Sequence, residues 1–119
     1  MPRFKVPYND KTLMAWAERR FGKSKAKRVR WRKLKNANWY GTWDWNGTIE
    51  LNLAMIRSRS TLYRTMAHEW KHAQQTWREY KKLSKIYSYK NHPLEKEARM
   101  AERLSQVANN SKKVKPGFF

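Results

Sequence analysis

The sequence predicts an α+β domain, and three patterns carry that prediction. Apolar residues recur at three- and four-residue steps from residue 62 to residue 77, as on the buried side of a helix. Arginines alternate with apolar residues from Arg28 to Arg32, as in a strand with one apolar and one cationic face. The pair Asn46-Gly47 is typical of a β-hairpin turn. We therefore expect helices packed against a small antiparallel sheet.

The first helix is expected near the N-terminus. Asn9 or Asp10 is a suitable capping residue, and Gly22 is a suitable end. The inward side of this helix would consist of Leu13, Ala17 and Phe21. The basic strand follows, and its arginines would share one face while Val29 and Trp31 share the other.

Two loop lengths are open for the hairpin around Asn46-Gly47. A two-residue turn is the default for this pair and would place Trp45 opposite Thr48. A three-residue loop with Gly47 in the left-handed conformation pairs Asp44 with Thr48 instead. We prefer the longer loop because it separates apolar from polar side chains. The apolar face would then contain Trp39, Trp43, Ile49, Leu51 and Leu53. Core packing is the preferred role of the two tryptophans, and stacking on nucleic-acid bases is the alternative.

Two further helices complete the expected domain. The buried stripe of the first would consist of Leu62, Met66, Trp70, Ala73 and Trp77. The second begins at Pro93, with Asn91 or His92 as its cap. Its apolar side would continue through Ala101, Leu104 and Val107. We assign residues 1–108 to a single domain and interpret residues 109–119 as a basic, mobile tail.

The stretch His68-Glu69-Trp70-Lys71-His72 is the most informative part of the chain. Residues four apart lie on one face of a helix, so His68 and His72 can bind one metal ion together. Zinc suits two imidazoles plus a carboxylate, and it makes water a usable nucleophile near neutral pH. Such a motif arises by chance in about one chain of this size in a few hundred. Helical phase counts against chance, because both histidines lie opposite the apolar stripe and face a cleft or solvent.

The third metal ligand is expected among the few acidic residues of the chain. The chain has 9 acidic and 28 basic residues, yet Glu69, Glu95 and Glu97 all fall within the two motif segments. The 22 residues between His72 and Glu95 suffice to finish one helix, turn, and bring a second helix back against it. Glu97 lies nearer the middle of the apolar arc of its helix, where a buried acid needs a partner. Glu97 is therefore either a support for the ligands or the third ligand itself.

His68-Glu-x-x-His72 followed by Glu95-x-x-Ala98 resembles the gluzincin metallopeptidases, in which two histidines and a glutamate on a separate helix bind zinc. The small size is similar to that of minigluzincins, and residues 93–99 resemble phage and bacterial ImmA-like and SprT-like proteins. The resemblance covers roughly residues 40–108, including a strand before the motif helix. It implies a minimal zincin-like domain with zinc ligands His68, His72 and Glu95 and with Glu69 as general base. The family spacing favours Glu95 over Glu97.

One position departs from the gluzincin pattern. Members of the family often place Asp or Asn four residues after the ligand glutamate, where it can orient a zinc-binding histidine. This chain has Arg99 there, and a guanidinium cannot accept a hydrogen bond from an imidazole.

The net charge of +19 is the second strong signal. It is densest from residue 19 to residue 35, where ten basic residues occur without an acid. Arg28, Arg30 and Arg32 on one strand face could contact successive phosphates, which sets affinity rather than sequence preference. A solvated basic face that only aids solubility is the alternative. A sequence pI near 10.6 favours a nucleic-acid partner, DNA or RNA, over a membrane surface, because the basic stretch lacks a broad apolar helical face.

These signals together predict a zinc metallopeptidase that acts on a protein or peptide, on or near nucleic acid. Glu69 would accept a proton as water attacks the scissile carbonyl, and residues 48–53 could align the substrate as a strand. The candidate oxyanion stabilisers are Tyr87, Tyr89 and His92. The alternative is a non-catalytic nucleic-acid-binding protein with a structural zinc site. The sequence lacks a long apolar run and a signal-peptide pattern, so we expect a cytoplasmic protein, or one in the virion if a phage encodes it.

Overall fold

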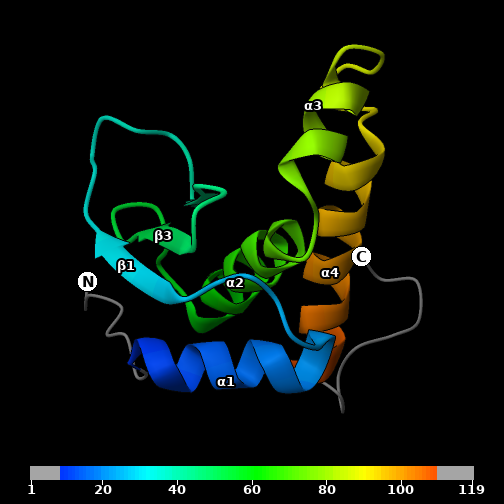
Figure 1. Cartoon of the computed structure of the whole chain (residues 1–119). Helices are drawn as coiled ribbons and strands as arrows, with labels where there is room; N and C mark the ends of the chain where they lie inside the picture. Colours follow the sequence, from blue (N-terminus) through cyan, green and yellow to red (C-terminus); the bar gives the residue numbers. More distant parts are fainter. Residues whose placement is uncertain (1–8, 110–119) are drawn as a thin grey trace.

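The protein is an α+β domain of four helices and one three-stranded mixed sheet over the described residues (Figure 1). The computed structural model describes residues 9–109, with side chains up to residue 105. The residues outside this range include 1–8, which we assigned to the domain, and 110–119, which make up all of the predicted tail except Asn109. Asn109 is the last residue of the final helix. The side chain of Val107, predicted to lie on the apolar side of that helix, also falls outside the described part.

Helix α1 (Asp10–Phe21) begins and ends where its capping residues predict. The Asn9 side chain accepts a hydrogen bond from the backbone N–H of Thr12 at 2.8 Å. Gly22 ends the helix with φ 91°, a conformation that a residue with a Cβ rarely adopts. Leu13 and Ala17 are buried as expected, and Phe21 is partly buried against the same core.

The sheet is mixed, so our expectation of an antiparallel sheet is wrong for one strand pair. Strand β1 (Arg28–Arg32) runs parallel to β3 (Thr48–Asn52), while β2 (Gly41–Trp43) runs antiparallel to β3. The strand order is β1-β3-β2. The most buried strand is thus central, with Ile49 and Leu51 fully buried, because a central strand loses the most contact with water.

Asn52 holds the long connection between β1 and β2 against the sheet. Its Oδ1 accepts a hydrogen bond from the N–H of Leu34 at 2.9 Å. Its Nδ2 donates to the carbonyls of Leu34 at 3.0 Å and Trp39 at 3.1 Å. Asn52 is fully buried, so satisfying its amide in this way avoids a large desolvation cost. These hydrogen bonds fix the part of the connection that directly precedes β2 in the sequence.

The hairpin between β2 and β3 has the three-residue loop that we preferred. The backbone N–H of Asp44 donates to the carbonyl of Thr48 at 3.1 Å, and Gly47 has φ 100°. Trp43 is paired with Ile49, and both side chains are buried, so the prediction of core packing for Trp43 is confirmed. Trp45 also has a positive φ, 63°, which is unusual for a bulky residue.

Helix α2 (Arg59–Ala73) is the central helix and packs against α1, the sheet and the last helix (Figure 1). Its predicted stripe of Leu62, Met66, Trp70 and Ala73 is buried. The indole N–H of Trp70 donates to the carbonyl of Gly22 at 2.8 Å and ties α2 to the end of α1. Trp77 was wrongly included in this stripe, because the helix ends at Ala73 and Trp77 is 48% exposed.

Two helices follow α2, and the first of them was not predicted. Helix α3 (Trp77–Ser84) is capped by Thr76, whose hydroxyl accepts a hydrogen bond from the N–H of Glu79 at 3.2 Å. Helix α4 (Pro93–Asn109) begins at the predicted proline and packs along α2. Its buried side is rotated from our expectation, because Leu104 is 43% exposed while Ser105 is buried. This rotation matters for the site, since it carries Glu95 inward.

Candidate metal centre

Three predicted ligands meet between α2 and the first turn of α4. His68 and His72 lie one turn apart on α2, and Glu95 reaches them from α4. Glu95 Oε1 is 3.3 Å from His68 Nε2 and 3.1 Å from His72 Nε2. One ligand atom from each residue lies within 4.8 Å of the others. The three residues therefore form a cluster that could bind a metal ion.

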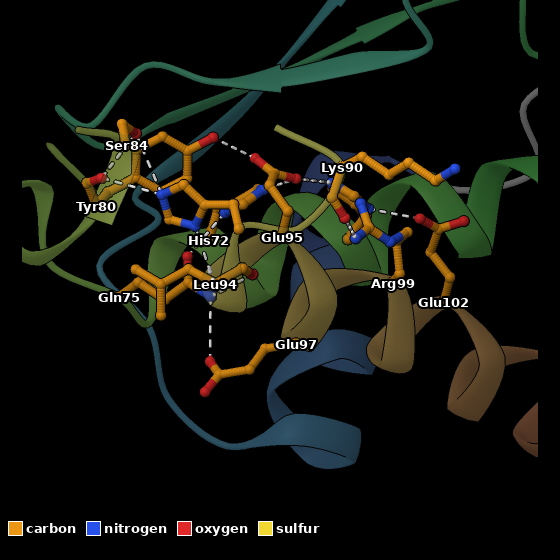
Figure 2. Close-up of polar contacts among 12 residues, drawn as sticks. His72, Gln75, Tyr80, Ser84, Lys90, Leu94, Glu95, Glu97, Arg99 and Glu102 are labelled. Carbon is orange, nitrogen blue, oxygen red and sulfur yellow. Dashed lines mark hydrogen bonds and ion pairs between the residues drawn. The ribbon is translucent and has the colours of Figure 1, made fainter. Parts of the chain in front are cut away.

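Glu95 and Glu97, which the sequence left open as third ligands, have different surroundings. Glu95 is 3% exposed, and it faces His72 (Figure 2) as well as His68. Glu97 is exposed, and its Oε1 accepts a hydrogen bond from Gln75 Nε2 at 3.2 Å. The rotation of α4 explains the difference, because it turns residues 94, 95 and 98 toward α2 and leaves 97 at the edge. Glu97 thus supports the site through Gln75.

Each histidine is oriented by a hydrogen bond on the side of its ring away from Glu95. His68 Nδ1 donates to Glu102 Oε2 at 2.5 Å. His72 Nδ1 donates to Gln75 Oε1 at 2.8 Å. With the Nδ1 hydrogens engaged, both Nε2 atoms turn toward Glu95, which is the orientation that metal-binding histidines require.

Glu102 is a residue of the candidate metal centre that the sequence reasoning missed. Arg99 cannot orient a histidine, and its Nη2 instead donates to the carbonyl of Lys90 at 2.6 Å (Figure 2). Glu102 stands one helical turn beyond position 98 and two turns beyond Glu95, on the same side of α4. Its other oxygen, Oε1, lies 3.6 Å from Arg64 Nη2. The available signal was the seven-residue spacing from Glu95.

Tyr80 is a second residue that the sequence reasoning missed. Its hydroxyl donates a hydrogen bond to Glu95 Oε2 (Figure 2), whereas both histidines contact Oε1, so Tyr80 holds the other oxygen of the carboxylate. The Tyr80 ring is stacked on His92, with 4.2 Å between ring centroids. Tyr80 lies on α3, the helix that was not predicted, and that is why its position could not be anticipated.

His92 has a structural role in this arrangement. Its Nε2 donates to the carbonyl of Tyr80 at 3.0 Å, with Ser84 Oγ also close at 3.2 Å. Its Nδ1 accepts a hydrogen bond from the N–H of Leu94 at 3.1 Å, so His92 caps α4 as the sequence allowed. Both ring nitrogens of this buried side chain are therefore engaged in joining α3 to α4.

The electrostatics of the cluster favour a bound cation. Burial alone would lower the pKa of His68, but hydrogen bonds with Glu102 and Glu95 outweigh it and raise the pKa to about 10. Burial alone would raise the pKa of Glu95, but hydrogen bonds from His68, His72 and Tyr80 hold it well below its usual range. The surrounding carboxylates thus stabilise positive charge at His68, and a metal ion could replace that proton.

Glu69 lies beside the three candidate ligands and is itself buried. Burial raises the pKa of Glu69, while the charges of His68 and His72 oppose the rise. Two hollows, of about 190 Å³ and about 280 Å³, meet at the residues that line both of them. These shared residues are Gly41, His68, Glu69 and Tyr89. The two hollows therefore adjoin each other at the candidate metal centre, and we refer to them together as the groove.

Strand β2 forms one wall of this groove. Gly41 allows the close approach, because a Cβ there would lie 2.6 Å from Thr65 Cγ2 on α2. Tyr40 accepts from Asn52 and Asp44 donates to Thr48, so the main-chain groups of Gly41 and Trp43 point away from β3. Our suggestion that residues 48–53 align a substrate is wrong, because β3 is paired on both sides. The free edge at the groove belongs to β2.

The three candidate oxyanion stabilisers differ in whether they line the hollows. Tyr89 lines both hollows, and burial together with the charge of Glu95 raises its pKa. Tyr87 and Tyr89 are both exposed, but Tyr87 is absent from the lining of both hollows, and His92 is engaged at the start of α4.

The basic strand has the predicted alternation. Val29 is buried and Trp31 is partly buried, while Arg28 and Arg30 are exposed. Glu50 on β3 faces the arginines: its Oε2 is 3.0 Å from Arg32 Nη1 and 3.7 Å from Arg30 Nη1. Part of the positive charge of this face is therefore neutralised within the protein.

No protein-family model matches the chain, and comparisons with curated proteins and with solved structures find no match either. The relation to gluzincins therefore remains a prediction from the motif residues. Among residues 9–109, no helix combines the length and the apolar character that crossing a membrane requires.

Proposed function

We propose that the protein is a zinc-dependent metallopeptidase that hydrolyses peptide bonds. The observation that carries this proposal is the position of Glu69, a buried carboxylate beside three convergent ligand groups and lining both hollows of an open groove. A site that only joins two helices has no use for a further carboxylate facing a groove. A general base for hydrolysis needs that placement.

The donor set supports zinc as the metal. Two imidazole nitrogens and one carboxylate oxygen are a common catalytic set for zinc, and the described residues supply these three ligands, leaving a position for water or substrate. The orienting bonds from Glu102 and Gln75 are of the kind that zinc histidines make. Zinc held by His68, His72 and Glu95 would polarise the scissile carbonyl and lower the pKa of water.

Residues of the chain would carry out proton transfer, oxyanion stabilisation and substrate alignment. Glu69 accepts a proton from the attacking water and delivers it to the leaving amine, and its raised pKa suits both steps. Tyr89 is the oxyanion stabiliser that we favour, because it borders both hollows beside the ligands. Gly41 and Trp43 offer main-chain groups along the groove, so an extended peptide can pair with β2 as an added strand.

We also propose that the protein works on or near nucleic acid. The support is the net charge of +19 together with the exposed arginines of β1. The alternative function is a non-catalytic nucleic-acid-binding protein in which a metal joins α2 to α4. The hydrogen bonds that already join these helices through Gln75 favour the enzyme, because the helices are connected without a metal.

The test compares wild-type protein with Glu69→Gln, which keeps the shape of the side chain and removes the base. Hydrolysis of a fluorescently labelled unfolded protein by the zinc-loaded variant should fall by about two to four orders of magnitude. Zinc content and melting temperature should stay close to those of wild type. Glu18→Gln, an exposed acid on α1, is the matched control and should keep full activity.

Two outcomes would contradict the proposal. Hydrolysis that survives in Glu69→Gln would remove the general base from the mechanism. Wild-type protein that binds zinc and cleaves no unfolded or DNA-bound protein would favour the structural-metal alternative.

A further inference from the structure

The larger hollow differs in charge from the rest of the protein. The chain has 28 basic residues and a net charge of +19, yet no lysine or arginine is found among the described residues that line this hollow. Two carboxylates line it instead, Glu69 from α2 and Glu102 from α4. The larger hollow is thus a place that attracts cations in a protein whose net charge repels them.

Three aromatic side chains also line the larger hollow. Trp39 is partly buried, whereas Tyr40 is 48% exposed and Tyr89 is 65% exposed. Asn52 holds the main chain of the first two: its Nδ2 donates to Trp39 O at 3.1 Å, and its backbone N–H donates to Tyr40 O at 2.8 Å. Aromatic rings attract cations that lie over their faces. The aromatic residues and the carboxylates of this hollow therefore favour the same kind of occupant.

Glu102 has one oxygen that is not used to orient a metal ligand. Its Oε2 is hydrogen-bonded to His68, while its Oε1 lies 3.6 Å from Arg64 Nη2. That distance is longer than a hydrogen bond, and the Arg64 side chain is 53% exposed, so the two groups form only a loose ion pair. Oε1 is therefore within reach of a guanidinium, and a cation that enters the hollow can share this oxygen with Arg64 or replace it.

Size and charge together restrict the occupant. At about 280 Å³ the larger hollow is just below the roughly 300–1,000 Å³ of pockets for drug-sized ligands, so it suits one long side chain. Zinc at the candidate metal centre would add two positive charges, which Glu69 and Glu95 balance, so Glu102 stays available to the occupant. A lysine or arginine side chain can lay its apolar stem along aromatic rings while its charged end reaches a carboxylate.

We propose that the larger hollow binds a lysine or arginine side chain of the substrate, with Glu102 Oε1 as its counter-charge and the ring of Tyr40 against its charged end. This inference rests on the proposed peptidase function for the nature of its ligand. It makes basic proteins the substrate class. Proteins that bind nucleic acid contact phosphates through lysine and arginine, so the preferred substrate would share a nucleic-acid partner with the enzyme.

The experiment measures binding to zinc-loaded Glu69→Gln, which lacks the proposed general base. Isothermal calorimetry compares capped hexapeptides Ala-Ala-X-Ala-Ala-Ala in which X is arginine or citrulline, an uncharged side chain of nearly the same shape. A second pair compares lysine with norleucine. The charged peptide of each pair should bind roughly three- to thirtyfold more tightly than its uncharged partner. The net charge of +19 alone predicts the opposite order, because it repels cationic peptides.

Two substitutions outside the metal ligands test the two parts of the hollow. Tyr40→Leu removes the ring, so the preference for arginine over citrulline should fall about threefold or more, whereas Tyr40→Phe keeps the ring and should keep the preference. Arg64→Ala removes the internal cation from Glu102 and should increase the preference by about two- to fivefold. Arg19→Ala removes the same charge from an exposed position on α1 and is the matched control. Glu102 itself is left intact because it also orients His68.

The outcomes are distinct from those for the proposed function. Equal affinities for the arginine and citrulline peptides, or no binding of either, would overturn the inference even if wild type cleaves proteins. A preference that is unchanged in Tyr40→Leu would overturn the role of the ring, and one that is unchanged in Arg64→Ala would overturn the role of Glu102. Selective binding without hydrolysis of the same peptides by wild type would uphold the inference and refute the peptidase.

Circular dichroism and zinc content show whether each variant is folded. If Tyr40→Leu does not fold, the comparison of Arg64→Ala with Arg19→Ala decides the case.

Discussion

The histidines at the candidate metal centre are oriented by two different partners. His68 has a carboxylate behind it, Glu102, while His72 has the neutral amide of Gln75. A carboxylate makes an imidazole a stronger base and a stronger metal ligand than an amide does. Gln75 in turn donates to Leu94 O and to Glu97, so its orientation is also fixed. Both histidines are therefore held from α4, His68 directly by Glu102 and His72 through Gln75.

The sequence predicts the three ligands because the spacing of His68 and His72 is diagnostic and acids are scarce. It does not predict Glu102, because we tested only the position four residues after Glu95. Residues seven apart also share a helix face, so a residue that orients His68 could stand at position 99 or at position 102. The choice of Glu95 over Glu97 depends on how α4 is rotated about its axis. The packing of α4 against α2 determines this rotation, and the local sequence pattern does not.

Three glutamine substitutions should lower zinc affinity to graded extents. Glu95→Gln removes a direct ligand and should have the largest effect. Glu102→Gln leaves the ligands in place but weakens the support of His68, so affinity should fall by about 10- to 100-fold. Glu97→Gln changes an exposed acid that acts only through Gln75, so it should have the smallest effect and serves as the matched control. Competition with a chromogenic chelator gives the affinities.

If all three variants bound zinc as tightly as wild type does, the third ligand would lie elsewhere. A loss confined to Glu97→Gln would reverse the assignment of the ligand glutamate.

At the scale of elements, the hairpin was predictable and the sheet as a whole was not. The three-residue loop follows from the alternation of apolar residues, because a shift of one residue would expose Trp43 or Ile49. The parallel pairing of β1 could not be read in the same way, since nothing in its five residues indicates which edge of another strand it joins. Helix α3 was missed because Trp77 continues the apolar spacing of α2, although Thr76 caps a new helix.

The hairpin loop is fixed by Asp44, whose Oδ1 accepts backbone hydrogen bonds from Asn46 at 2.7 Å and from Thr48 at 3.0 Å. Burial raises the pKa of Asp44, but these hydrogen bonds and the charge of Arg28 together outweigh it and lower the pKa from 3.8. A carboxyl group with a lowered pKa in the folded state stabilises the fold above its unfolded pKa. That contribution is lost as the pH falls below 3.8 and through the folded pKa.

Replacing Asp44 by Asn should therefore destabilise the protein in a pH-dependent way. Above about pH 5, where the wild-type carboxyl is ionised, the variant should melt a few degrees lower, as expected for a loss of about 1 kcal/mol. The difference should shrink as the pH falls below 3.8, because wild type then loses the same charge. Thermal unfolding of both proteins followed by circular dichroism from pH 2.5 to pH 7 measures it. A difference that does not change with pH would mean that the Asp44 charge does not contribute.

At the scale of the whole molecule, the groove and the basic strand occupy separate places. Strands β1 and β2 are the two edges of the sheet, with β3 between them. The groove lies along β2, and the arginines belong to β1. A nucleic acid bound along β1 would therefore leave the free edge of β2 available to a peptide. This arrangement suits an enzyme that cleaves proteins while bound to nucleic acid.

The role of the basic strand can be tested by replacing Arg28, Arg30 and Arg32 together with Ser. Nucleic-acid affinity should fall similarly for different sequences, because phosphates are alike. The slope of log affinity against log salt should become shallower by roughly 2–3 units if each arginine displaces one counterion. We expect the lower end of this range, because Glu50 already neutralises part of the charge of Arg30 and Arg32. Fluorescence anisotropy with labelled DNA and RNA over a salt series measures both quantities.

A second triple variant separates the location of the charge from its amount. Serine at Lys82, Lys85 and Lys90 removes the same charge from exposed positions on and after α3. This variant should bind nucleic acid more tightly than the arginine variant, and both should keep the zinc content of wild type, since neither touches the ligands. Equal losses in the two variants would show that only net charge matters. Wild-type protein that binds neither DNA nor RNA at low salt would reduce the charge of +19 to a contribution to solubility.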